Sequence, residues 1–136
     1  MAENKLNLKI ITPERILVNE EVDSVFSKAV DGEFGIMPGH IPFMTPLSIC
    51  VTKYNKEGKE EYVSTIGGVF QVSGNSITIL TENAELGEEI DVVRARAAKE
   101  RAETRLRAGT RDVDVQRAEV ALSRAIARIH AASRMR

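Results

Sequence analysis

The periodicity of the sequence changes near residue 88, and this change most constrains the fold. Before it, short runs of alternating apolar and polar residues are separated by Gly, Pro and Asn, a pattern typical of β-strands. After it, apolar residues recur every three or four positions in an Ala- and Arg-rich stretch, which is typical of helices. The sequence therefore predicts an all-β region over residues 1–87 and a helical region over residues 88–136.

The distribution of charged residues also changes near residue 88. Eleven of the twelve arginines lie in residues 88–136, whereas six of the seven lysines precede them. The first region carries 7 basic and 12 acidic groups, a net charge of −5, and the second carries 12 basic and 8 acidic groups, a net charge of +4. Such an asymmetry indicates that the two regions have different partners, and that the helical region needs an anionic one.

The first region has the frequent turn and loop residues of an all-β domain. A loop over residues 55–59 separates two strand-like runs and predicts a hairpin, and a Gly67-Gly68 pair precedes another run. Many short strands with frequent turn residues favour a β-sandwich or a flattened barrel.

The second region predicts an antiparallel two-helix hairpin. Asp91 is suited to cap a helix that runs to about residue 107, and the Gly-containing residues 108–110 end it. Asp112 is suited to cap a second helix over about residues 113–132, and the short link between the two predicts an antiparallel pair. The apolar stripe of the second helix consists of Val115, Ala118, Leu122, Ala125 and Ile129. Because buried alanine contributes little, we expect the hairpin to be weakly held.

Arginines recur on one face of each predicted helix. They are Arg94, Arg101 and Arg105 on the first helix, and Arg117, Arg124 and Arg128 on the second. Folding the hairpin about residue 110 places Arg94 between Arg124 and Arg128, where like charges repel unless an anion separates them. Guanidinium groups suit phosphate oxygens, which favours a phosphate ligand. The alternative is a solvated face, with the arginines paired to Glu100, Glu103 or Glu119.

Residues 32–42 form the other distinctive segment, because glycines and prolines fix a compact path that carries apolar side chains. Such a segment suits a docking surface. The alternative is a turn cluster that only plugs the sandwich. His40 lies in this segment and His130 far away on the second helix, and no catalytic constellation or metal-ligand cluster accompanies either one.

Other features narrow the class of protein. The single cysteine, Cys50, excludes an internal disulfide and a Cys-based metal site. No apolar stretch reaches the roughly 20 residues of a membrane span, and the first residues lack a signal-peptide core. We therefore expect a cytosolic protein that meets a membrane only through partners.

Several segments together resemble the epsilon subunits of bacterial F-type ATP synthases. They are residues 11–14, 32–42 and 67–70, together with the helical hairpin. The resemblance implies a non-catalytic regulatory subunit at the cytoplasmic face of the bacterial cell membrane, with a β-sandwich of about ten strands that docks on the central-stalk gamma subunit and the c-ring. The implied contact residues are Glu33, Phe34, Met37 and His40.

A narrower resemblance concerns residues 90–95, which read Ile-Asp-Val-Val-Arg-Ala and fit the I/L-D-x-x-R-A pattern of epsilon subunits that bind ATP. It implies that Ile90 and Ala95 flank the adenine, and that Glu85 and Asp91 accept hydrogen bonds from its amino group or from ribose. The triphosphate would be neutralised by Arg94, Arg101, Arg124 and Arg128. The role of Mg²⁺ stays open.

The resemblance also implies how the hairpin regulates the enzyme. An extended hairpin reaches the alpha/beta catalytic head and restrains ATP hydrolysis, whereas a folded hairpin, favoured by ATP, permits rotation. A second hypothesis is an adaptor protein that binds nucleic acid through the basic hairpin. The acidic β region, the near-neutral total charge and the scarcity of aromatic residues all speak against it.

Overall fold

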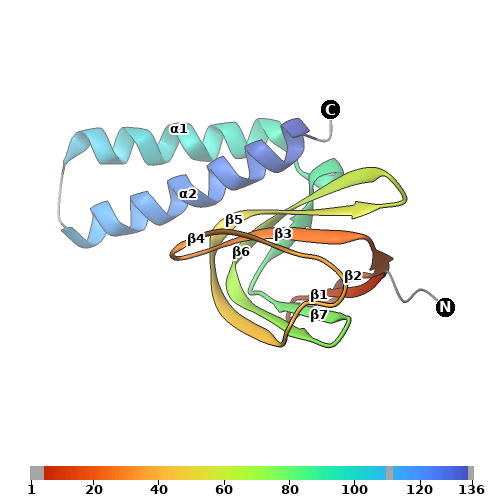
Figure 1. Cartoon of the computed structure of the whole chain (residues 1–136). Helices are drawn as coiled ribbons and strands as arrows, with labels where there is room; N and C mark the ends of the chain where they lie inside the picture. The colour runs from red at the N-terminus through yellow and green to blue at the C-terminus, as the bar shows by residue number, and fades with distance from the viewer. Residues whose placement is uncertain (1–4, 110–111, 135–136) are drawn as a thin grey trace.

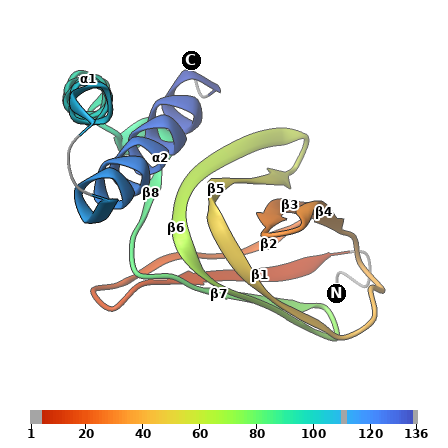
Figure 2. The ribbon, with the colours of Figure 1, turned by 90° about the vertical axis from the view of Figure 1, so that its left-hand side faces the viewer.

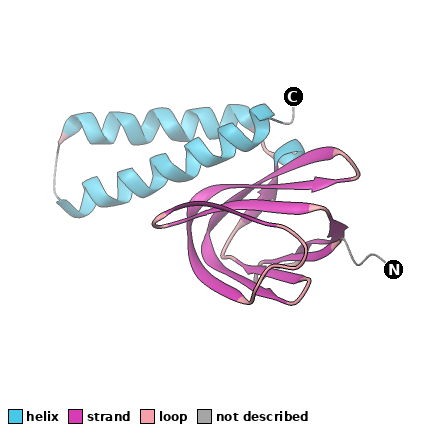
Figure 3. Ribbon diagram, in the orientation of Figure 1, coloured by secondary structure: helices cyan, strands magenta, loops and turns pink. Residues whose placement is uncertain are grey.

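The computed structural model describes residues 5–109 and 112–134, and shows a curved β-sheet domain with a helical hairpin on one side (Figures 1 and 3). The predicted turn residue Thr110 and the side chain of the predicted cap Asp112 lie outside this description. The strands are β1 (Leu6–Ile11), β2 (Ile16–Val22), β3 (Ser24–Ala29), β4 (Gly32–Ile36), β5 (Phe43–Lys56), β6 (Lys59–Ser73), β7 (Ser76–Leu80) and β8 (Ala84–Leu86). A short 3-10 helix η1 (Gly87–Glu89) leads to α1 (Val92–Ala108) and α2 (Asp112–Arg134).

The strands form one sheet that folds over on itself as a sandwich (Figure 2). Their order is β2-β1-β7-β6-β5-β3-β4, and β8 pairs with β6. All pairs are antiparallel except β1 with β7. The predicted fold class is confirmed, with eight strands among the described residues where about ten were expected. β5 and β6 are long, with 14 and 15 residues, and both curve from one layer toward the other (Figure 2).

The bend of β6 lies at its glycine pair. Gly67 and Gly68 both have positive φ, 69° and 116°, and the pairing of β6 with β5 is interrupted at Gly67, between Ile49↔Ile66 and Leu47↔Gly68. A Cβ atom on Gly68 would lie 2.0 Å from the backbone oxygen of Leu80 on the neighbouring strand. The bend therefore depends on the absence of a side chain at Gly68.

The alternating strands bury one aliphatic core. Leu6, Leu8 and Ile10 of β1 are fully buried, and so are Ile79 of β7 and Phe70 of β6. Phe34 packs edge-on against Phe70, with ring centroids 4.8 Å apart. Burial of such side chains supplies most of the stability of the sandwich.

The helical hairpin touches the sandwich mainly through α2. α1 lies on the far side of α2 from the strands (Figures 1 and 2). A small apolar cluster of Tyr62, Ile90, Ala131 and Ala132 joins the end of α2 to the sandwich. The buried residues of α1 are only Ala95 and Ala102, so its packing removes little apolar area from water. Among the described residues, no helix is long and apolar enough to span a membrane.

One buried hydroxyl offers a test of the packing beside the hairpin. Ser64 on β6 is fully buried, and within the described structure its Oγ makes no hydrogen bond. An unsatisfied buried polar group costs free energy. We therefore expect Ser64→Ala to keep or raise the free energy of unfolding, by up to about 1 kcal/mol, as measured by urea denaturation.

The matched control for this test is Thr52, whose hydroxyl bonds Ser27 and Thr65 at 2.9 Å each. Thr52→Val removes a satisfied hydroxyl and should lower stability by about 1 kcal/mol. A loss of more than 1 kcal/mol in Ser64→Ala would show that the Ser64 hydroxyl is satisfied after all.

Candidate functional site

A cavity of about 550 Å³ lies where the sandwich, the hinge and both helices meet. Its walls come from the β1–β2 turn, from β8, from the segment that joins η1 to α1, and from α2. The lining includes six of the eight residues predicted to bind ATP: Glu85, Ile90, Asp91, Arg94, Ala95 and Arg128. Residues that are 43 positions apart in the sequence thus share one cavity.

The hinge residues are positioned by local geometry. Asp91 caps α1 by accepting a hydrogen bond from the backbone N–H of Arg94 at 3.1 Å. Ile90 is 3% exposed and is anchored in the apolar cluster beneath the end of α2. This anchor and this cap fix the direction in which α1 leaves the sandwich, and they place Arg94 and Ala95 on the cavity wall.

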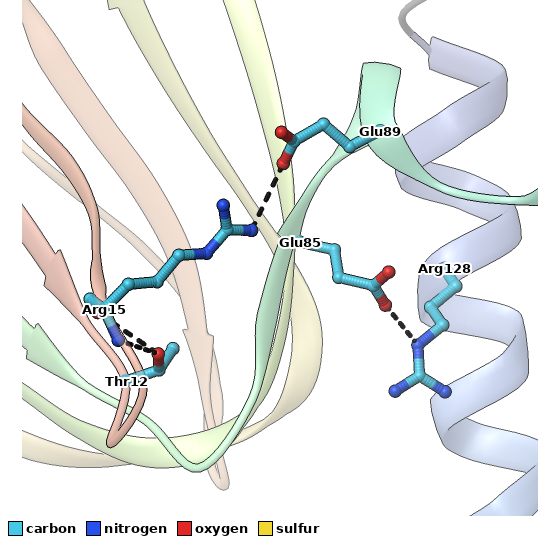
Figure 4. A network of polar contacts seen from close by, with 5 residues as sticks. All are labelled: Thr12, Arg15, Glu85, Glu89 and Arg128. Carbon is cyan, nitrogen blue, oxygen red and sulfur yellow. Dashed lines mark hydrogen bonds and ion pairs between the residues drawn. The ribbon is translucent and has the colours of Figure 1, made fainter.

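Ion pairs already engage two of the three arginines in the cavity (Figure 4). Arg128 donates from Nε to Oε1 of Glu85 at 2.7 Å, which ties α2 to β8. Arg15 donates from Nη2 to Oε1 of Glu89 at 3.4 Å. Arg94 is exposed and, within the described part of the chain, forms no ion pair. Of the three described arginines in the cavity lining, Arg94 therefore has the guanidinium that no carboxylate holds, and it is available to an anionic ligand.

The other two predicted arginines lie outside the cavity lining. Arg101 on α1 and Arg124 on α2 are both exposed. Arg101 lies seven positions after Arg94, about 10 Å along the helix axis, whereas Arg124 lies one turn before Arg128. The alternative pairing with Glu100, Glu103 or Glu119 is not seen, because no ion pair among the described residues joins them to an arginine.

The predicted partner-contact residues are spread between the core and the surface. Phe34 is half-buried and packs on the core, as expected for a plug. Met37 is 48% exposed, and Ile41 and Met44 beside it are more exposed still. His40 lies between them, with its Nδ1 2.8 Å from the backbone oxygen of Ile41. Glu33 lines a second cavity, between the sandwich and α2.

An exposed aliphatic row crosses four strands and was missed by the sequence reasoning. Cross-strand pairs join Ile16 to Ile11, Ile11 to Leu80, and Leu80 to Val69. Ile16 and Leu80 are about half exposed, and Val69 is 37% exposed. The signal was present in the sequence, since adjacent apolar residues such as Ile10-Ile11 and Ile79-Leu80 put apolar side chains on both faces of a strand.

The described residues around the cavity were expected to carry no metal site, and the groups that could form one are limited. Among the residues that the structure describes, no three His, Cys, Asp or Glu side chains are grouped so that they could hold a metal ion. Cys50 is buried. The fold and the site thus define a β-sandwich protein with exposed apolar patches and a helical hairpin hinged beside a charged cavity.

Comparison with known families identifies this class more closely. The family ATP synthase, Delta/Epsilon chain, is matched twice: its beta-sandwich domain by residues 5–87 and its long alpha-helix domain by residues 88–133. The chain therefore belongs to the ATP synthase delta/epsilon family, as the resemblance in the sequence predicted. This assignment replaces the alternative of a nucleic-acid adaptor.

Individual relatives agree with the family match. The chain is 48% identical over 103 residues to the ATP synthase epsilon chain of Carboxydothermus hydrogenoformans, covering 76% of this chain and 77% of the relative. It is 43% identical over 110 residues to that of Citrifermentans bemidjiense, covering 81% and 79%. The fold resembles a chain of the mitochondrial ATP synthase of Euglena gracilis, with a TM-score of 0.78, 24% identity and coverage of 88% and 76%.

Proposed function

We propose that this chain is a non-catalytic subunit of the central stalk of a bacterial F-type ATP synthase, held at the cytoplasmic face of the cell membrane by its partners. The relatives named above are ATP synthase epsilon chains. The Euglena structure is described as an assembly with F1 and the c-ring, and a Tetrahymena thermophila neighbour with a TM-score of 0.62 as a central stalk and c-ring. Proton transport and ATP synthesis would then be properties of the complex.

The sandwich supplies two surfaces for the proposed partners. The first is the exposed apolar tip at Met37, Ile41 and Met44, next to His40, and we assign it to the c-ring. The second is the aliphatic row from Ile16 to Val69, which we assign to the gamma subunit. Exposed contiguous apolar side chains of this kind are typical of protein interfaces.

The hairpin is the regulatory part, and ATP is its ligand. The observation that carries this proposal is the convergence of Glu85, Asp91, Arg94 and Arg128 on one cavity at the hinge. Its volume of about 550 Å³ lies in the range of small-molecule sites. Ile90 and Ala95 would flank the adenine, and Arg94 and Arg128 would meet the phosphates. Arg101 and Arg124 would contact the phosphates only if their side chains reach back toward the cavity.

Binding would stabilise the folded hairpin, because the cavity exists only while the helices lie against the sandwich. A ligand specific for the folded state stabilises it by about 1.4 kcal/mol at tenfold excess over Kd. That is a large effect on a hairpin packed mainly through alanines. Without ATP, the hairpin would extend to the alpha/beta catalytic head and restrain ATP hydrolysis.

Equilibrium dialysis of the full chain with ATP tests the ligand. We expect saturable binding, and an absence of binding at millimolar ATP would contradict the regulatory proposal while leaving the stalk role intact.

Hydrolysis by the assembled enzyme tests the inhibitory role. Assembled enzymes in which this chain is shortened to residues 1–87 should hydrolyse ATP faster than enzymes with the full chain, because they lack the hairpin that reaches the head. The difference should be largest at low ATP, when the hairpin is extended. Equal rates at all ATP concentrations would show that the hairpin does not inhibit this enzyme.

A further inference from the structure

The cavity has a wall that the predicted ATP-binding residues do not account for, and it comes from the sandwich. Thr12, Glu14 and Arg15 of the β1–β2 turn line it. The turn is closed by hydrogen bonds: the Thr12 N–H donates to the Arg15 oxygen at 2.9 Å, and the Arg15 N–H donates to the Thr12 hydroxyl at 3.2 Å. The backbone of Arg15 is thus held in place where its side chain can reach the hinge.

The Arg15 side chain extends from this turn to Glu89 (Figure 4). Glu89 ends η1 and directly precedes Ile90, at the side of the cavity where the base is proposed to lie. Arg128 approaches Glu85 from the opposite side of β8 (Figure 4). The ion pair of Arg15 is 3.4 Å long between half-exposed side chains, and exposed pairs of this kind are weak. It orients the guanidinium without preventing contact with a ligand.

The face of a purine base can stack on a planar partner, and none of the described lining residues is aromatic. A guanidinium can take that part, because its flat face stacks on aromatic rings. We propose that Arg15 is a specificity-determining residue that covers the purine base of a nucleoside triphosphate, with Glu89 as the residue that positions it. This inference rests on the proposed ATP site.

The test measures binding by the full chain to ATP and to inorganic tripolyphosphate, by isothermal titration calorimetry. Arg15→Ala should weaken ATP binding about fivefold and change tripolyphosphate binding less than twofold. Arg15→Lys should not restore ATP binding, because lysine keeps the charge and lacks the plane. Glu89→Gln should lower ATP affinity about twofold, because the guanidinium loses its anchor. The matched control is Arg96→Ala, an exposed arginine of α1 outside the cavity, which should leave both ligands unaffected.

The outcomes separate this inference from the proposed function. If the unmodified chain fails to bind ATP, the proposed site is wrong and the role of Arg15 falls with it. If it binds ATP and Arg15→Ala binds equally well, the site stands and the inference alone is wrong. If Arg15→Lys binds ATP as well as the unmodified chain, or if Arg15→Ala weakens tripolyphosphate binding as much as ATP binding, Arg15 acts only as a positive charge. Either result would also overturn the proposed contact with the base. Unchanged melting temperatures should accompany these variants, because Arg15 is exposed.

Discussion

Replacing Arg94 by alanine is expected to weaken ATP binding about 30-fold, since hydrogen bonds to charged groups contribute about 2 kcal/mol. Arg94 lines the cavity beside the hinge and, among the described residues, forms no ion pair. Its whole guanidinium is therefore available to phosphate, unlike that of Arg128, which is held by Glu85. Calorimetric titration of ATP into the full chain measures the change.

The design of this test exploits a neighbouring arginine. Arg96 lies two residues further along α1, is also exposed and does not line the cavity, so Arg96→Ala removes the same charge and side chain from a place that should not matter. Both variants should keep the thermal stability of the unmodified chain without ATP, because alanine favours helix at both positions. An added stabilisation by ATP should survive in Arg96→Ala and be lost in Arg94→Ala. Equal ATP affinity in the two variants would contradict the site.

Local signals made the helical hairpin predictable. The cap at Asp91 and the glycine at position 109 were expected to bound the first helix, and α1 runs from Val92 to Ala108 with Asp91 as its cap and Gly109 in the left-handed conformation. Capping depends on residues within one turn of each other, so the sequence alone reveals it.

The sequence does not reveal which strands pair when they lie far apart along the chain. The parallel pairing of β1 with β7 joins strands about 70 residues apart, and alternation within each strand carries no information about its partner. That pairing contributes to the position of the β1–β2 turn opposite the hinge, so the contribution of Arg15 to the cavity could not be read from the sequence. The bending of β5 and β6 into both layers likewise depends on where each strand pairs.

The sequence also could not predict which of the helix arginines line the cavity. Helical spacing predicts that Arg94 shares a face with Arg101, and Arg124 with Arg128, but a face extends the length of a helix while a cavity does not. The cavity is formed where β8 and η1 meet the helices, and of these four described arginines Arg94 and Arg128 line it. The position of the sandwich edge, which the sequence does not give, decides which arginines line it.

Gly68→Ala is expected to be the most destabilising single methyl addition in the sandwich, at roughly 3 kcal/mol or more. Two separate costs combine at this residue. Its φ of 116° is one that side-chain-bearing residues rarely adopt, and an added Cβ would lie 2.0 Å from the backbone oxygen of Leu80. Relief requires β7 to move away from β6, which breaks the pairing of Leu80 with Val69. Urea denaturation of the isolated chain measures the loss.

Gly74→Ala is the matched control, because Gly74 also has a positive φ, 60°, but an added Cβ there meets no atom within 4 Å. It should cost only about 1 kcal/mol, the conformational cost alone. Because Leu80 and Val69 belong to the aliphatic row assigned to the gamma subunit, Gly68→Ala should also weaken assembly at temperatures where the sandwich stays folded, whereas Gly74→Ala should not. Similar losses of stability in the two variants would show that β7 yields easily, and that Gly68 is needed for its backbone conformation rather than for the close approach of Leu80.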